Sequence, residues 1–233
     1  MTTAHPVTTP FGLTIPAWCR RVIIVGAGGF GREVLLWARD AWPEQFGRIS
    51  GFLSADPAVL DGHSVRLPIL GNPETFAVEP GDGFLLAIGI PQVRRHVAER
   101  LAHRGANFLS LVHPTAVVAP TATVGAGSII CPYAVVSDAV FLGRCVLLNY
   151  HASLGHDAKA GDYVVFAPYA TLGGHAIVED DVFLGLHATV GPRVRVGAAT
   201  KISANSAALV SVAPQTLVYG VPGRSGQQVV VTP

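Results

Sequence analysis

Hydrophobic residues recur at every sixth position through the second half of the chain. Sixteen consecutive hexads fit this spacing from Val112 to Ile202 without an insertion, and fifteen begin with a large apolar residue. Four places later every hexad has a small or β-branched residue, from Ala116 to Ser206. The 3.6-residue period of an α-helix cannot produce this pattern. The pattern therefore predicts a repeat architecture in which each hexad is one short strand and a turn.

Three hexads close one triangular coil of eighteen residues, so the repeat predicts a parallel β-helix, or prism, of about five coils. The aliphatic residue fills the interior, and neighbouring coils pair in parallel so that the backbone groups are satisfied. Glycine, asparagine and aspartate gather where unusual backbone angles are needed, at the corners. His151, His175 and His187 share the fourth place in their hexads and are expected at corners. His151, Tyr169 and His187 are expected to stack in one column.

The first half of the chain has a different pattern, a buried strand that runs into a glycine-rich loop. The strand begins at residue 21, the loop contains Gly26, Gly28 and Gly31, and an amphipathic helix follows. Glycines permit a tight turn and the close approach of a phosphate, which a helix N-terminus also attracts. The pattern predicts further strands at 49–53, 83–88 and 108–112, the last leading into the prism, and a helix at 93–103.

These patterns divide the chain into four segments and predict an α/β domain followed by a β domain. Residues 1–20 form a loosely packed N-terminal extension, and residues 21–110 form a small Rossmann-like domain. Residues 111–224 form the prism, and residues 225–233 form a C-terminal tail.

Composition and charge narrow the range of partners and compartments. The net charge is +1 and 13% of residues are charged, which gives no reason to expect nucleic acid or an anionic membrane as partner. No apolar run approaches the roughly 20 residues of a membrane-spanning helix, and the first residues lack the pattern of a secretory signal. The three cysteines lack CxxC spacing, so neither a disulfide framework nor a zinc knuckle is indicated. The sequence is that expected of a reduced, cytoplasmic protein.

A glycine-rich α/β domain followed by hexapeptide coils resembles the sialic acid O-acetyltransferases and the bacterial UDP-4-amino-sugar N-acetyltransferases. The resemblance covers about residues 21–224 and includes Val218–Arg224, which is similar to the family's terminal signature. It implies a left-handed prism, whereas the usual crossover preference would favour the right-handed connection. It also implies that the N-terminal domain holds a sugar nucleotide. Acetyl-CoA is then expected along the prism, between two subunits of a homotrimer.

The stretch from Asn149 to Asp157 matches the family segment in which a histidine and an acid carry the chemistry. The match implies His156 as general base, Asp157 as its orienting carboxylate and Asn149 as an acceptor contact. Histidine suits proton transfer near neutral pH, and a carboxylate can hold its tautomer. The remaining expected contacts are Gly26, Gly28, Gly29, Phe30 and Asp56 for the sugar nucleotide, and Gly173, Gly174, Leu186 and Ala204 for acetyl-CoA. Acetyl-CoA is expected as a co-substrate, with no resident cofactor and no metal.

The chain departs from the family pattern at three places. Phe30 stands where the family often has histidine, and Ser54-Ala55 stand where it often has two aspartates. Val165 replaces a second histidine nine residues past His156. The first two departures concern recognition of the nucleotide, and the third concerns acetyl-CoA.

The function predicted from these residues is transfer of an acetyl group to an amino sugar, with O-acetylation of a sialic-acid-like sugar as the alternative. A γ-carbonic-anhydrase-like metal site would use His151 and His156, but Thr115 stands where its third histidine is required. A non-catalytic scaffold and a nicotinamide-dependent enzyme remain as other classes. The latter needs an acidic residue after the second strand, where only Asp56 is found. Asp157 and His175 lie one coil apart. They are expected either to form a simple structural hydrogen bond or to interact so that His175 helps to hold Asp157.

Overall fold

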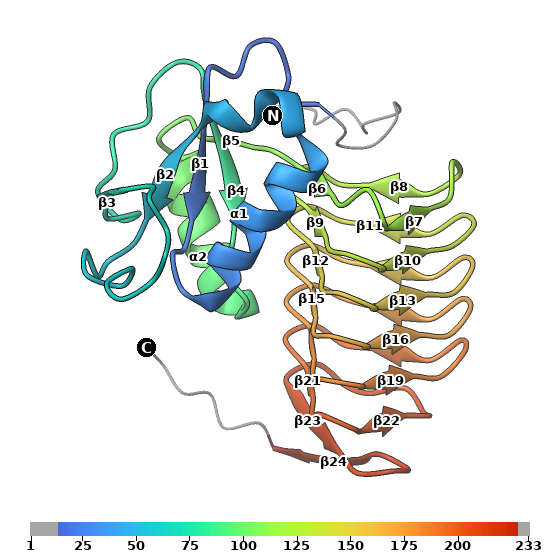
Figure 1. Ribbon diagram of the computed structural model, residues 1–233. Coiled ribbons are helices and arrows are strands. Elements are labelled where there is room, and N and C mark those ends of the chain that lie inside the picture. Colours follow the sequence, from blue (N-terminus) through green and yellow to red (C-terminus); the bar gives the residue numbers. More distant parts are fainter. Residues whose placement is uncertain (1–13, 228–233) are drawn as a thin grey trace.

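The computed structural model describes residues 14–227 and shows an α/β domain beside a long triangular prism (Figure 1). The α/β domain has a parallel five-stranded sheet in the order β3-β2-β1-β4-β5. Its strands are β1 (Arg21–Val25), β2 (Ile49–Leu53), β3 (Ile69–Gly71), β4 (Asp82–Leu86) and β5 (Asn107–Phe108). Its helices are α1 (Gly29–Ala41), the 3-10 helix η1 (Pro43–Arg48) and α2 (Pro91–Ala102). This is the Rossmann-like arrangement predicted from the glycine loop.

The prism is built from two-residue strands, and strands eighteen residues apart pair in parallel on three faces. The first face consists of β6 (Leu111–Val112), β9 (Ile129–Ile130), β12 (Leu147–Leu148), β15 (Val165–Phe166), β18 (Phe183–Leu184), β21 (Lys201–Ile202) and β23 (Thr216–Tyr219). The second face consists of β7 (Val117–Val118), β10 (Val135–Val136), β13 (Ser153–Leu154), β16 (Thr171–Leu172), β19 (Thr189–Val190) and β22 (Ala207–Ala208). The third face consists of β8 (Thr123–Val124), β11 (Phe141–Leu142), β14 (Lys159–Ala160), β17 (Ile177–Val178) and β20 (Arg195–Val196).

The stack is longer than the predicted five coils. Five coils have a strand on all three faces, and β21 and β22 begin a sixth whose third side is only a bridge between Val196 and Val212. The first face then continues into β23, which pairs antiparallel with β24 (Arg224–Gln227). The hexad count missed this end because the strict six-residue spacing is lost after Ala208, while the strand pairing continues.

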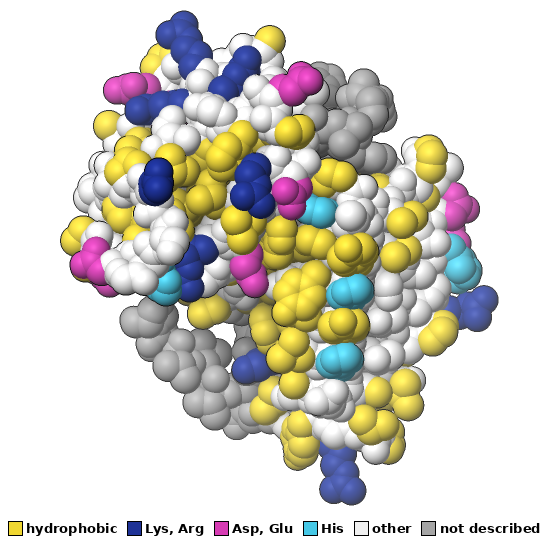
Figure 2. All heavy atoms as spheres, viewed as in Figure 1, with side chains coloured by type: hydrophobic (Ala, Val, Ile, Leu, Met, Phe, Trp, Pro, Cys, Tyr) yellow, Lys and Arg dark blue, Asp and Glu magenta, His cyan; other side chains and the backbone are white. Residues whose placement is uncertain are grey.

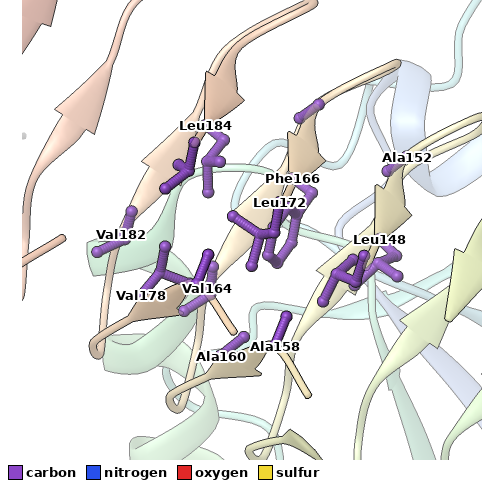
Figure 3. Close-up of a cluster of buried hydrophobic side chains, with 14 of the residues drawn as sticks. Leu148, Ala152, Ala158, Ala160, Val164, Phe166, Leu172, Val178, Val182 and Leu184 are labelled. Carbon is purple, nitrogen blue, oxygen red and sulfur yellow. The ribbon is translucent and has the colours of Figure 1, made fainter. Parts of the chain in front are cut away.

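The prism interior is filled as the hexads predict. The second residue of each short strand points inward, and Leu148, Phe166 and Leu184 stack without solvent exposure (Figure 3). Ser128 is a polar residue in a small-residue position, and it is buried at 0% exposure. Its hydroxyl donates to the Gly143 carbonyl and accepts from the Val146 N–H, which satisfies it.

From Gly127 to Asn205, each turn of the prism has one residue with a left-handed backbone angle. We call the turns between the first and second faces the first corner, those between the second and third faces the second corner, and those between the third and first faces the third corner. The left-handed residues at the second corner are Ala139, Asp157, His175 and Arg193, with φ of 53 to 61°. Their strain is offset by backbone hydrogen bonds between successive coils, such as His175 N–H to the His156 carbonyl at 2.9 Å.

The α/β domain covers the first face of the prism. Outward-facing Leu111, Ile129, Leu147 and Val165 are at most 2% exposed and belong to one apolar cluster with Val34 and neighbouring residues of α1. The predicted strand at 108–112 is therefore wrong as one element. Its first part, β5, pairs with β4 in the Rossmann-like sheet, and its second part, β6, pairs with β9 in the prism.

The two predicted terminal segments are only partly described. Residues 1–13 and 228–233 lie outside the described residues. Within the predicted extension, Ile15 and Cys19 are 2% and 1% exposed and pack into the α/β core, so residues 15–19 are not loosely packed. Residues 225–227 of the predicted tail belong to β24 (Arg224–Gln227). Within residues 14–227, no helix is both long enough and apolar enough to cross a membrane.

Candidate active site

His156 and Asp157 form a hydrogen-bonded pair at the second corner, on the turn between β13 and β14. His156 Nδ1 lies 2.8 Å from Asp157 Oδ2, and the side chains are 60% and 45% exposed. The hydrogen bond from His156 holds the pKa of Asp157 below its ordinary value, and the charge of His175 acts in the same direction. A carboxylate that stays ionised accepts the Nδ1 proton, so the Nε2 lone pair faces away from it. The pair therefore presents a basic nitrogen at the prism surface.

The His156 ring packs against Gly174, which lies on the next coil of the prism. A Cβ at Gly174 would lie 2.8 Å from His156 Nε2 and 2.9 Å from Cε1, so a larger residue would displace the ring. Among the described residues, the Gly174 N–H has no hydrogen-bond partner. A free amide beside a basic nitrogen is suited to stabilise negative charge on a reacting carbonyl oxygen. Gly173 and Gly174 were predicted to meet the thioester, and the structure places them beside the predicted base.

The glycine loop lies at the carboxyl edge of the Rossmann-like sheet. Gly26 has φ of 104°, and a Cβ there would lie 2.5 Å from the Ala87 carbonyl oxygen, so only glycine fits. Gly28 and Gly29 are exposed, with no neighbour within 3.8 Å of an added Cβ, and Gly28 precedes the first turn of α1. This helix N-terminus has no side-chain cap and no acidic residue in its first turn, which leaves its amides favourable to a phosphate.

Two of the expected nucleotide contacts, Phe30 and Asp56, have local structural roles. Phe30 is partly buried and meets Trp37 of the same helix with ring centroids 5.9 Å apart. Asp56 is exposed, and its carboxylate accepts the Ala58 N–H at 2.9 Å in a tight turn. Its second oxygen has no partner among the described residues.

Other expected site residues lie on a different corner from His156. Asn149, Leu186 and Ala204 lie at the first corner, whereas Gly173 and Gly174 lie at the second. Asn149 Oδ1 accepts the Tyr150 N–H at 2.8 Å, and Leu186 is 49% exposed. One chain therefore does not bring the two sets together. The loops of the second corner also lie on the side of the prism away from the α/β domain (Figure 1).

An exposed ladder of flat rings follows the first corner. His151 stacks on Tyr169 with centroids 4.7 Å apart, and Tyr169 stacks on His187 at 4.6 Å. The predicted column is confirmed, and it extends to Tyr133, 5.1 Å from His151, which the sequence reasoning did not include. Figure 2 shows histidines alternating with hydrophobic side chains along the prism, next to the α/β domain. Since His151 is on the first corner and His156 on the second, they cannot hold one metal ion within one chain.

Arg94 of α2 was missed by the sequence reasoning. It is 0% exposed and joins the two units, with Nε donating to the Cys145 carbonyl at 2.6 Å and Nη1 donating to the Leu86 carbonyl at 2.5 Å. Burial lowers the pKa of Arg94 to about 10. The sequence did offer one sign of this role. Arg94 lies between Pro91 and Val97 on the buried face of α2, where an apolar residue is expected. Arg94 thus ties the end of β4 to the prism.

Comparison with known proteins links both units to one group. Residues 21–101 match the family described as the PglD N-terminal domain. The chain is 29% identical over 143 residues to GDP-perosamine N-acetyltransferase of Escherichia coli O157:H7, covering 60% of this chain and 64% of that protein. It is 34% identical over 115 residues to UDP-N-acetylbacillosamine N-acetyltransferase of Bacillus subtilis, covering 48% and 51%. The alignments thus span less than two thirds of these curated relatives.

A solved structure resembles nearly the whole chain. PerB from Caulobacter crescentus, determined with CoA and GDP-perosamine, superposes with a TM-score of 0.78 at 27% identity. The superposition covers 88% of this chain and 97% of PerB. The left-handed sense predicted for the prism is that of such neighbours. The chain is thus similar to the perosamine and bacillosamine N-acetyltransferases, with an N-terminal domain that matches the PglD N-terminal family and a prism like that of PerB.

Proposed function

We propose that this protein transfers the acetyl group of acetyl-CoA to the amino group of a nucleotide-linked amino sugar. The observation that carries the proposal is the His156–Asp157 pair, whose free Nε2 lies over Gly174 and beside an unpaired backbone amide. Two relatives are named as N-acetyltransferases of nucleotide amino sugars, and PerB holds CoA and GDP-perosamine. Among the classes considered, only acyl transfer uses both the base and the free amide.

In the proposed reaction the sugar nitrogen attacks the thioester carbonyl directly. His156 Nε2 takes a proton from that nitrogen as the C–N bond forms, and Asp157 stabilises the imidazolium. The Gly174 N–H donates to the carbonyl oxygen while it is negatively charged. The carbon–sulfur bond then breaks, and the imidazolium returns the proton to the sulfur of coenzyme A. No acyl-enzyme is required, and Cys19, Cys131 and Cys145 are all buried.

The proposal includes a homotrimer with sites between copies. The α/β domain covers the first face, whereas His156 lies at the corner between the other two faces. The predicted donor contacts are also divided between two corners of one chain. Two copies packed prism against prism would bring a first corner and a second corner together, which supplies both walls of a groove. A protein that runs as a monomer in size-exclusion chromatography with light scattering would contradict this part of the proposal.

The relatives do not single out one nucleotide for the acceptor, since they include a GDP-sugar enzyme and a UDP-sugar enzyme. The free N-terminus of α1 and the open space at Gly28 and Gly29 support a diphosphate at this loop in either case. Phe30 offers an apolar ring there in place of a charged or hydrogen-bonding side chain.

The test is thiol release from acetyl-CoA with a panel of GDP- and UDP-linked 4-amino sugars and their hydroxyl counterparts. His156→Ala is measured in parallel with the control His63→Ala, which removes an exposed histidine of the α/β domain. Release with an amino sugar, lost in His156→Ala and retained in His63→Ala, is the expected result. Release with hydroxyl sugars alone would move the reaction to O-acetylation. Turnover that survives in His156→Ala would exclude His156 as the base.

A further inference from the structure

Three side chains with metal-binding atoms meet at the second corner. His156, Asp157 and His175 each offer one such atom, and the three atoms lie within 4.8 Å of one another. Asp157 Oδ2 is central, 2.8 Å from His156 Nδ1 and 3.7 Å from His175 Nε2. The imidazole rings of His156 and His175 meet edge to face, with centroids 5.1 Å apart. His156 and Asp157 are neighbours on one turn, and His175 is the residue equivalent to Asp157 one coil later. Their side chains thus converge on one point.

The donor set and its spacing suit a divalent transition metal. Zinc takes nitrogen and carboxylate ligands at about 2.0–2.2 Å, so tetrahedral ligands lie roughly 3.3 Å apart. The two separations from Asp157, 2.8 and 3.7 Å, bracket this value, and the side chains are 60%, 45% and 47% exposed, so they are free to rotate around an ion. Two imidazoles and one carboxylate leave the fourth position open. The backbone beneath is held by the His175 N–H to His156 carbonyl bond.

We propose that His156, Asp157 and His175 form an inhibitory site for a divalent transition-metal ion, and that zinc binding and acetyl transfer exclude each other. The inference rests on the proposed function of His156. Metal at Nδ1 takes the place of the proton that Asp157 accepts, and the ring proton then sits on Nε2. Nε2 has no lone pair in that tautomer, so it cannot accept a proton from the acceptor sugar. The same ion removes Asp157 from the histidine.

The surroundings of the three side chains favour weak, reversible metal binding over a permanently bound ion. The three ligands are exposed to solvent, and the cation Lys159 acts on Asp157. Arg193, also exposed, occupies the equivalent position one coil beyond His175. Positive charge close to the site lowers the affinity for a divalent cation.

The test uses the full chain, freed of metal by chelator and titrated with Co²⁺ and Zn²⁺. Visible absorption reports Co²⁺ coordination, calorimetry reports Zn²⁺ binding, and residual acetyl transfer is measured in zinc-buffered solutions. His175→Ala removes one ligand at a left-handed corner position, a backbone conformation that alanine already adopts at Ala139 and Ala199. His187→Ala is the matched control, at the same hexad place but in the ring ladder of the first corner.

One Co²⁺ ion per chain with the absorption of a four-coordinate site is expected for the unmodified protein and for His187→Ala. His175→Ala is expected to bind Zn²⁺ at least about 100-fold more weakly, and inhibition relative to its own metal-free rate shifts by the same factor. Absence of a saturable Co²⁺ signal, or zinc inhibition equal in all three proteins, would overturn the proposal. The spectroscopic result is independent of turnover, so a failure of the acetyltransferase proposal would be recognised separately.

Discussion

Gly174→Ala tests the placement of His156 with one methyl group. The added Cβ would lie 2.8 Å from Nε2, 2.9 Å from Cε1 and 3.3 Å from Cδ2 of the His156 ring, whereas ordinary contact begins at 3.4 Å. The ring must therefore move away by about 0.6 Å or rotate. Gly174 is not in the left-handed region, so alanine adds no backbone strain of its own.

The expected loss can be worked from this displacement. Misplacing a reacting group by about 1 Å costs up to roughly 10²-fold in rate. A movement of about 0.6 Å is then expected to lower kcat by about 10- to 100-fold, which is about 1.4–2.7 kcal/mol of transition-state stabilisation. The fold should be unaffected, because the clash is with an exposed side chain, which can move into solvent, and not with backbone.

Steady-state kinetics and thermal unfolding together decide the outcome. The matched control is Gly191→Ala, one coil beyond Gly173, where an added Cβ meets nothing closer than 3.4 Å. Gly174→Ala should lose kcat and keep the midpoint of unfolding, and Gly191→Ala should keep both. Coenzyme A binding, measured by calorimetry, separates displacement of His156 from direct obstruction of the donor. An unchanged kcat in Gly174→Ala would refute the argument that His156 acts from its observed position.

The remaining predictions concern the acid, the core and the thiols. Asp157→Asn should lower kcat by about 10²- to 10⁴-fold. Because the lowered pKa of Asp157 keeps it ionised in the native protein at pH 6 and pH 8 alike, the loss should be equal at both, and a smaller loss at pH 6 would contradict the assignment. Phe166→Ala, at 0% exposure in the prism, should cost about 3–5 kcal/mol of unfolding free energy in urea titrations, and a cost under about 1 kcal/mol would contradict the packing. Burial raises the pKa of the Cys19, Cys131 and Cys145 thiols, so they should react with a disulfide reagent only after unfolding, and prompt native reaction at pH 7.5 would show an opening motion.

The candidate site shows how far sequence reasoning reached. The pairing of His156 with Asp157 was expected from the resemblance of residues 149–157 to the family segment, and the structure has the two side chains hydrogen-bonded. The convergence of His175 with them follows from an eighteen-residue coil and was foreseen as a pairing with Asp157. That Asn149 and Leu186 lie on a different corner from His156 was not foreseen. Asn149 and His156 are close in sequence, but strand β13 lies between them, so they belong to two different corners of the prism.

By itself the sequence determined the prism, its inward residues and the stacked column of the first corner, because a strict six-residue period leaves one way to bury the aliphatic positions. It also determined the strand, loop and helix around Gly26, where backbone freedom is required. The tertiary structure decided which prism face the α/β domain covers, where the strand at 108–112 divides, and that Arg94 is buried between the units. These three features depend on contacts between the two units, which the spacing of residues along the chain does not specify. Which apolar face is covered depends on the shapes of the two surfaces and on the hydrogen bonds that must be satisfied between them.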